Sequence, residues 1–283
     1  TIDDIVDIYG PFDCIFVGHY WLHDGNHNLF DPWPQSGLSK TLHKKFIFLN
    51  KEYTNLDKKL QWIKKNKFEC VFSHYQHCAK WQKKTQTNFK YIPFACDYKF
   101  FNFSEKKRKY DLGFSGILQN PRGNSLQSDI RKRILKRLYY TLFDIPLFKK
   151  KKYKHLSIFW NSIPSNFLGK VFSKIFKTYK FLNIVSYSEI QKNSKIFLNF
   201  KSPFNLIGPR YYENIASGCL IMTEKNDELK KIISDFSYIE FNSDLSNFDE
   251  VLNRSLKIFK ISKKKERKNQ LKYLKNILGT LEQ

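Results

Sequence analysis

Residues 192–229 read KNSKIFLNFKSPFNLIGPRYYENIASGCLIMTEKNDEL, and this stretch contains the transitions that decide the fold. A buried strand is predicted to end at Phe200, where a loop containing proline and glycine follows. A helix then begins near Pro209 and ends at Gly218, and a second apolar strand starts at Cys219. Proline near the start of a helix and glycine just past its end match the known preferences of these residues. A strand, a helix and a strand in this order are typical of parallel α/β architecture.

The same alternation of short apolar runs and amphipathic segments continues on both sides of this stretch. Strands are predicted over 13–18, 45–50, 68–73, 90–94, 110–116, 195–200, 219–223 and 237–241. Helices are predicted over 55–66, 126–142, 187–193, 210–217, 226–235 and most of 246–280. Residues 101–109 are polar and charged, which indicates a linker. We therefore expect two α/β domains, 1–104 and 105–283, the first of them lacking N-terminal strands.

The composition favours a folded protein with a strongly basic surface. Of the 283 residues, 41% are hydrophobic and 17% aromatic, enough for a packed core. No stretch approaches the roughly 20 apolar residues of a membrane-spanning helix. The net charge of +24 raises the possibility of nucleic-acid binding. The positive charge comes mostly from lysine and is spread along the chain, with one block at Lys149–Lys152 and Lys154. Attraction to an anionic membrane or an acidic glycan is therefore the preferred interpretation.

The cysteines indicate a reducing compartment, because they are odd in number and scattered, unlike those of a disulfide scaffold. They are Cys14, Cys70, Cys78, Cys96 and Cys219. The expected location is therefore the cytoplasm, with peripheral attachment to the inner face of the membrane left open.

Two groups of histidines and cysteines invite a metal interpretation. One comprises His19, His23 and His27; the other comprises Cys70, His74, His77 and Cys78. Turn-forming residues interrupt the first group, and the second fits no common zinc module. No metal site is expected.

The loop that leads into the helix at Arg210 has the properties of an anion site. Free N–H groups at a helix N-terminus, here preceded by Gly208, favour phosphate. The guanidinium of Arg210 is a bidentate donor to phosphate oxygens, and Glu213 lies one turn later, where a carboxylate can accept hydrogen bonds from ribose hydroxyls. The alternative is an exposed i,i+3 pair of little consequence. The chain has neither GxGxxG nor a Walker motif, so neither a nicotinamide cofactor nor ATP hydrolysis is indicated.

Three segments resemble group 1 glycosyltransferases, especially the CgeB-like branch. GPRYYENIASGCLIMTE at 208–224 resembles the donor-site segment of that family, YDLGFSG at 110–116 the strand that opens the donor domain, and YIPFACD at 91–97 the segment before the linker. The resemblance implies a GT-B fold, in which two Rossmann-like domains face each other across a cleft. It also implies transfer of a sugar from a nucleotide-diphosphate donor, without metal or cofactor, to a glycan or lipid-linked acceptor in surface polysaccharide synthesis.

The resemblance also suggests roles for individual residues. Glu213 matches the second glutamate of the family's E-x7-E motif, which holds the ribose, and Asn205 stands where the first glutamate is usual. Gly116 matches the phosphate loop, although Ile117 replaces the usual arginine, and Arg122 is a candidate to supply that charge. His19, in FDCIFVGHYWL at 12–22, matches the strand-end histidine that faces the donor sugar and is the candidate catalytic residue.

Two other functions stay open at this point. The missing first glutamate and the altered phosphate loop suit a catalytically inactive GT-B protein that serves in interactions. The high positive charge suits a nucleic-acid-binding protein.

Overall fold

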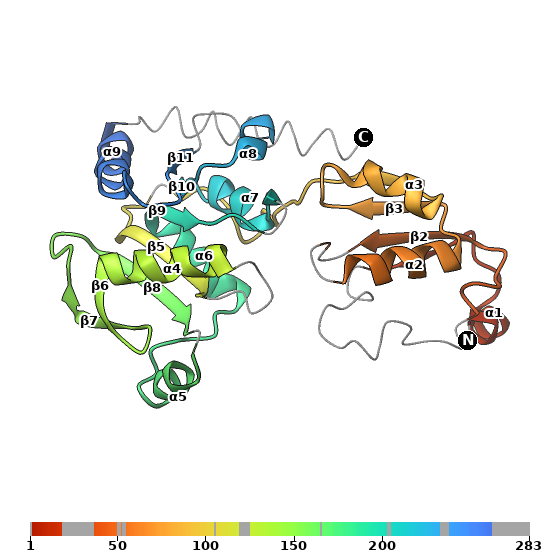
Figure 1. The fold of residues 1–283 in the computed structure, drawn as a ribbon, viewed down its shortest axis with the longest axis horizontal. Helices are drawn as coiled ribbons and strands as arrows, with labels where there is room; N and C mark the ends of the chain where they lie inside the picture. The colour runs from red at the N-terminus through yellow and green to blue at the C-terminus, as the bar shows by residue number, and fades with distance from the viewer. Residues whose placement is uncertain are drawn as a thin grey trace. The chain divides into compact units, whose positions relative to one another are not determined.

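The computed structural model describes residues 2–18, 37–49, 52, 55–104, 106–118, 125–164, 166–202, 205–232 and 238–261. The chain divides into two compact units, Thr1–Pro93 and Phe94–Gln283 (Figure 1). Each unit contains its own parallel sheet. None of the helices in the described ranges is long and apolar enough to cross a bilayer.

The first unit is a four-stranded sheet with strand order β1-β2-β3-β4, in which every neighbouring pair is parallel. Its core is built on Ile47, Leu49, Ile63 and Val71, which are fully buried. The elements are α1 (Ile2–Tyr9), β1 (Cys14–Val17), β2 (Lys44–Leu49), α2 (Leu56–Asn66), β3 (Cys70–Ser73), a 3-10 turn (Cys78–Trp81), α3 (Gln82–Thr85) and β4 (Asn88–Tyr91).

The second unit contains the rest of the described elements. They are β5 (Tyr110–Ile117), α4 (Ser125–Leu138), β6 (Tyr139–Leu142), β7 (Ile145–Lys151), β8 (Ile158–Ile163), α5 (Phe167–Ile175), α6 (Ile184–Lys192), β9 (Ser194–Asn199), α7 (Pro209–Ala216), β10 (Leu220–Glu224), α8 (Asp227–Ile232), β11 (Tyr238–Phe241) and α9 (Phe248–Ile261).

The main sheet of this unit has strand order β11-β10-β9-β5-β8, all parallel. In chain order this is 2-1-3-4-5, the doubly wound arrangement of flavodoxin-like folds. The chain leaves β5 toward β8 on one side and returns to β9 on the other, so the strand order reverses between β5 and β9. The prediction of an α/β fold with Rossmann-like parallel sheets is confirmed, whereas the cleft between two facing domains stays a prediction.

The predicted helix over 126–142 is wrong in its last turn. The helix α4 ends at Leu138, and β6 then pairs with β7 in an antiparallel hairpin. Phe143 and Asp144 form the two-residue turn, both with positive φ, which is the geometry that matches the twist of a hairpin. The sequence YYTL is rich in residues that favour strands, and this preference prevails over the helical pattern.

The segment predicted as a linker packs on the second unit. Arg108 is buried and donates hydrogen bonds to the carbonyl oxygens of Ser194 and Ser217, both at 2.8 Å. Gly218, with φ of +70°, leaves room for the ring of Phe103, which would lie 2.4 Å from an added Cβ. The two compact units divide after Pro93, whereas the sequence suggested a boundary after residue 104.

Candidate functional site

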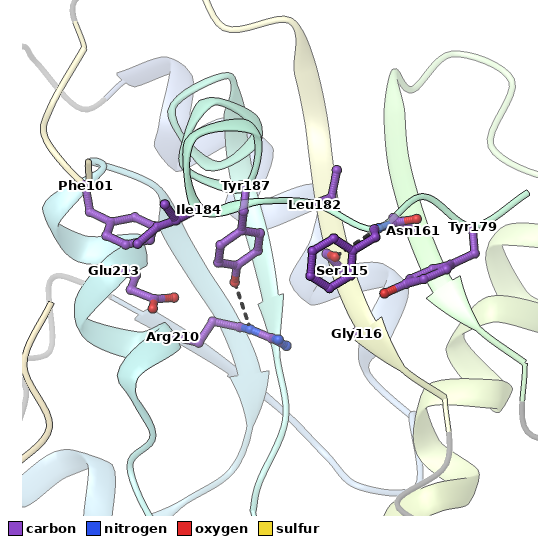
Figure 2. Close-up of a pocket in the computed structure, with 11 residues that line it drawn as sticks. Phe101, Ser115, Gly116, Asn161, Tyr179, Leu182, Ile184, Tyr187, Arg210 and Glu213 are labelled. Atoms are coloured by element: carbon purple, nitrogen blue, oxygen red, sulfur yellow. Dashed lines mark hydrogen bonds between the residues drawn. The ribbon is translucent and has the colours of Figure 1, made fainter. Parts of the chain in front are cut away.

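A pocket of about 310 Å³ opens where β5 ends, beside the point at which the strand order reverses. In open α/β sheets this crevice is the usual place for a ligand. All the residues that line the pocket belong to the second unit. Figure 2 draws them: Phe101, Ser115, Gly116, Asn161, Tyr179, Phe181, Leu182, Ile184, Tyr187, Arg210 and Glu213.

Arg210 points its guanidinium across the pocket toward the end of β5 (Figure 2). Its Nε donates a hydrogen bond to the Tyr187 hydroxyl at 3.0 Å, which fixes the direction of the side chain. The guanidinium lies against Gly116, where an added Cβ would be in van der Waals contact with Nη1 of Arg210 at 3.4 Å. The two Nη groups form no hydrogen bond or ion pair within the described ranges, so both stay available to an anion.

Glu213 lies one turn further along α7 on the same side of the pocket (Figure 2). It is half-buried, and burial raises the pKa of its carboxyl group above the ordinary value. The positive charge of Arg210 acts in the opposite direction and favours the carboxylate. A poorly hydrated carboxylate of this kind is a strong acceptor for hydroxyl groups of a ligand.

A second arginine adds positive charge behind the pocket. Arg131 of α4 donates from Nη1 to the carbonyl oxygen of Ile117, the last residue of β5, at 2.6 Å. Burial, and then repulsion by Arg210, lowers the pKa of Arg131 to about 10, so the side chain keeps its charge at neutral pH. Glu224 acts the other way and favours the charged form. Two guanidinium groups that repel each other at one strand end form a site suited to an anion.

The opposite wall of the pocket is held by a buried asparagine. The side chain of Asn161 donates to the carbonyl oxygen of Lys180 and accepts from its N–H, both at 3.0 Å. It also donates to Ser115 Oγ at 3.3 Å, which ties the wall to β5. This double contact fixes the segment that presents the rings of Tyr179 and Phe181 to the pocket.

Of the residues predicted from the sequence, the structure brings Gly116, Arg210 and Glu213 together. Asn205 is exposed in the preceding loop and Gly208 is the N-cap residue of α7; neither lines the pocket. The candidates His19 and Arg122 lie outside the described residues.

The sequence did not single out Tyr187, Asn161 or Arg131. Their roles depend on contacts with residues far along the chain, and no local spacing distinguishes them. Among the described residues, no three or more His, Cys, Asp or Glu side chains are grouped as metal ligands. The possible histidine group at 19, 23 and 27 lies outside that part of the chain.

Comparison with known proteins gives one relative of similar sequence. No family model matches the chain. An uncharacterised protein of Plasmodium falciparum (isolate 3D7) is 28% identical over an alignment of 239 residues that covers 78% of this chain. The chain spans only 14% of the length of that relative.

Two solved glycosyltransferases are similar in structure at low sequence identity. The pneumococcal O-GlcNAc transferase GtfA, in complex with UDP and GlcNAc, matches 86% of this chain and 50% of its own at 12% identity and a TM-score of 0.49. AviGT4, a glycosyltransferase involved in avilamycin A biosynthesis, matches 92% of both chains at 11% identity and a TM-score of 0.40. Both TM-scores are below 0.5, so the assignment of the pocket depends on its own geometry.

The pocket offers three kinds of contact side by side. Arg210 supplies a bidentate donor for a phosphate, and Glu213 an acceptor for hydroxyl groups. Tyr179 and Phe181 supply aromatic faces. A ligand that carries a phosphate, hydroxyl groups and a flat ring would use all three.

Proposed function

We propose that the second unit binds a nucleoside diphosphate sugar and that the chain transfers the sugar to a hydroxyl group of a glycan or lipid-linked acceptor. One observation carries the proposal: the guanidinium of Arg210, with both Nη groups available, lies against Gly116 where the strand order reverses. The resemblance of residues 208–224 to the donor segment of group 1 glycosyltransferases supports the same assignment.

In this proposal each side chain has a separate role. Arg210 binds the diphosphate, and Arg131 adds its positive charge from behind β5. Glu213 accepts hydrogen bonds from the ribose, and Tyr179 with Phe181 offers a surface for the base. The donor phosphates would thus face the end of β5, with the nucleoside between α7 and the aromatic wall.

The chemistry that follows is a substitution at the anomeric carbon. The oxygen of the acceptor hydroxyl group forms a bond to this carbon while the bond to the diphosphate breaks. The hydroxyl proton is released to solvent, and negative charge builds up on the departing nucleoside diphosphate. Fixed positive groups stabilise this charge more in the transition state than in the ground state. We propose that the two arginines provide this stabilisation without a resident metal ion or other cofactor.

Calorimetric titration with UDP, GDP and ADP tests the proposal. One of them is expected to bind more tightly than inorganic phosphate, because the base and ribose add contacts. Arg210→Gln should weaken that binding by about 2 kcal/mol, the scale of charge-assisted hydrogen bonds. Arg133→Gln is the matched control, since Arg133 is an exposed arginine of α4 that donates to Asp244 and Ser243 outside the pocket. Absence of nucleotide binding, or equal loss in both variants, would refute the proposal.

A second readout separates an enzyme from a protein that only binds nucleotides. The position of Asn205, outside the pocket and without a carboxylate, favours the non-catalytic alternative. Release of free nucleoside diphosphate from a bound sugar nucleotide, accelerated by an added acceptor glycan, is expected of a transferase. Tight binding with no release would favour the non-catalytic function.

A further inference from the structure

The helix α5 packs on its neighbours through its smallest residues. Gly169 and Ser173, four positions apart, are both buried. An added Cβ on Gly169 would lie 2.3 Å from the carbonyl oxygen of Phe143, in the turn of the β6–β7 hairpin. The ring of Phe172 stacks on that of Phe143 with centroids 5.3 Å apart. The side of α5 that carries Gly169 is therefore closely packed against the hairpin. Rotation of the helix about its axis would break these contacts.

The large apolar residues of the same helix face solvent. Phe167, Leu168, Val171 and Ile175 form one stripe by their spacing, and all four are exposed. Phe167 is 77% exposed and Ile175 62%. A surface helix of a globular protein normally buries such a stripe and exposes its small and polar residues. We call these four residues the α5 stripe; nothing within the described ranges covers it.

The sequence on both sides of the α5 stripe is uniformly basic. Residues 145–188 contain no aspartate or glutamate, and Lys170 and Lys174 border the stripe on α5 itself. Asp144, at the hairpin turn, is already paired with Lys132 at 3.5 Å. Within the described part of the chain, no lysine of residues 145–188 forms an ion pair with a carboxylate. These lysines are Lys149, Lys150, Lys151, Lys152, Lys154, Lys170, Lys174, Lys177 and Lys180.

We propose that α5 and its lysines dock on the surface of an anionic lipid bilayer. The α5 stripe would enter the boundary between headgroups and acyl chains, and the lysines would reach the lipid phosphates. The partner is identified by two properties together, because the surface offers hydrocarbon and positive charge in the same place. A second copy of the chain would bring like charges into contact, and a nucleic acid would leave aliphatic side chains such as Val171 and Ile175 without a partner.

The chain that leaves α5 leads to the mouth of the pocket. The segment between α5 and α6 supplies Tyr179, Phe181 and Leu182 to the pocket lining, and Phe181 is also 86% exposed. Docking of α5 would therefore hold this wall beside the lipid headgroups. If the proposed function holds, the arrangement suits an acceptor that is itself attached to a lipid, and this last step alone rests on that function.

Co-sedimentation with vesicles tests the proposal with the full chain. The probes are vesicles of phosphatidylcholine alone and of phosphatidylcholine mixed with phosphatidylserine. The chain is expected to prefer the mixed vesicles. The double variant Phe167→Gln, Ile175→Gln should lower the partition coefficient by about tenfold or more, since each exposed apolar side chain loses its burial in the interface. The double variant Lys170→Gln, Lys174→Gln should lower it by about tenfold at low salt and less at high salt.

Matched controls come from the first unit. Ile8→Gln, Leu42→Gln changes two apolar residues that are 71% and 100% exposed, and Lys58→Gln, Lys64→Gln removes two exposed lysines of α2. Both controls should stay within about twofold of the unchanged chain. Equal loss in a control and in its α5 counterpart would overturn the proposal, as would an absence of preference for phosphatidylserine. If the variant Lys170→Gln, Lys174→Gln lost retention on heparin but bound vesicles like the unchanged chain, the partner would be a polyanion. That result would also overturn the proposal.

Nucleotide titration of the same variants keeps the two proposals apart. The α5 variants are expected to bind nucleoside diphosphate like the unchanged chain, because none of the four substituted residues lines the pocket. A chain that binds no nucleotide but shows the expected vesicle pattern would refute the proposed function and leave the docking surface supported.

Discussion

Single side chains of the pocket are placed at a cost to stability. Glu213 is a half-buried acid whose pKa is raised by burial, and Arg131, behind the pocket, is a half-buried base whose pKa is lowered by burial and by Arg210. Each group would be better solvated in the unfolded chain. Charged groups held in poorly solvated positions beside one pocket are typical of a functional site.

Glu213→Gln should make the protein more stable while weakening ligand binding. Because the folded-state pKa is raised above the ordinary 4.5, the folded chain holds more protons between these two values. Stability then falls as the pH rises through this window, and the penalty persists at neutral pH. The variant lacks this penalty, so its melting temperature should exceed that of the unchanged chain at pH 7 and match it below pH about 4.

The same variant should lose about 1–3 kcal/mol of nucleoside diphosphate affinity, as measured by calorimetry. Equal melting temperatures at pH 7 would contradict the burial penalty, and unchanged affinity would contradict the assignment of Glu213 to the ligand.

Gly116→Ala should disturb the pocket through Arg210. The new Cβ would lie 3.4 Å from Nη1 of Arg210 and from the ring of Phe114, at a backbone φ that alanine rarely adopts. We expect about tenfold weaker nucleoside diphosphate binding in titrations. The control is Gly208→Ala, at a φ of −71° with no atom within 4 Å of the new Cβ, and it should bind normally. Similar affinities for the two variants would argue against a role for the guanidinium at the end of β5.

At the scale of helices and strands, the sequence predicts the parts in which local pattern and tertiary contacts agree. The strands β5, β9 and β10 and the helix α7 follow the expected alternation closely. The structure also brings Gly116, Arg210 and Glu213 together, because the carboxyl ends of parallel strands meet at one edge of a sheet. The order of the elements predicts the place of Arg210 and Glu213, and the resemblance to group 1 glycosyltransferases adds Gly116.

The unpredicted parts are those in which the local pattern is inverted. The helix α5 buries Gly169 and Ser173 and exposes its large apolar residues, and β7 ends in lysines. Tyr187 and Asn161 act through contacts with Arg210 and Lys180, which no spacing in the sequence reveals. Tertiary packing, rather than propensity, decides these positions.

The buried Arg108 shows how one side chain joins several elements. Its guanidinium bonds carbonyl oxygens at the end of α6, the start of β9 and the end of α7. It also lies 5.7 Å from the ring centre of Phe259 in α9. Helix C-termini carry partial negative charge, which compensates the guanidinium in place of a carboxylate.

Arg108→Met should lower the free energy of unfolding by about 3 kcal/mol or more, because several buried carbonyls lose their donor. Arg133→Met is the control, since Arg133 also donates to two carbonyl oxygens but is exposed. It should cost less than about 1 kcal/mol in urea denaturation. Equal costs would mean that burial of Arg108 contributes little.

For the molecule as a whole, the pocket and the α5 stripe both lie within the second unit. The first unit has its own sheet and its own core. The proposed binding of nucleotide and of lipid can thus be tested apart from the residues that precede Phe94.

A chain of residues 94–283 is expected to fold and to bind nucleoside diphosphate within about twofold of the affinity of the full chain. Circular dichroism would check the fold, and calorimetry the affinity. A folded fragment with much weaker affinity would show that the first unit contributes to the nucleotide site.

The position of β5 between β8 and β9 also bears on how the chain is made. Leu112 of β5 pairs with Ile158 of β8 and with Ile196 of β9, which are synthesised much later. Pairing at such sequence separation requires closure of long loops and is slow. During translation, Leu112 and Phe114 leave the ribosome well before either neighbouring strand exists. The newly made chain therefore passes through a period in which the apolar side chains of β5 are unshielded, and we expect chaperone supply and growth temperature to govern the yield of soluble protein.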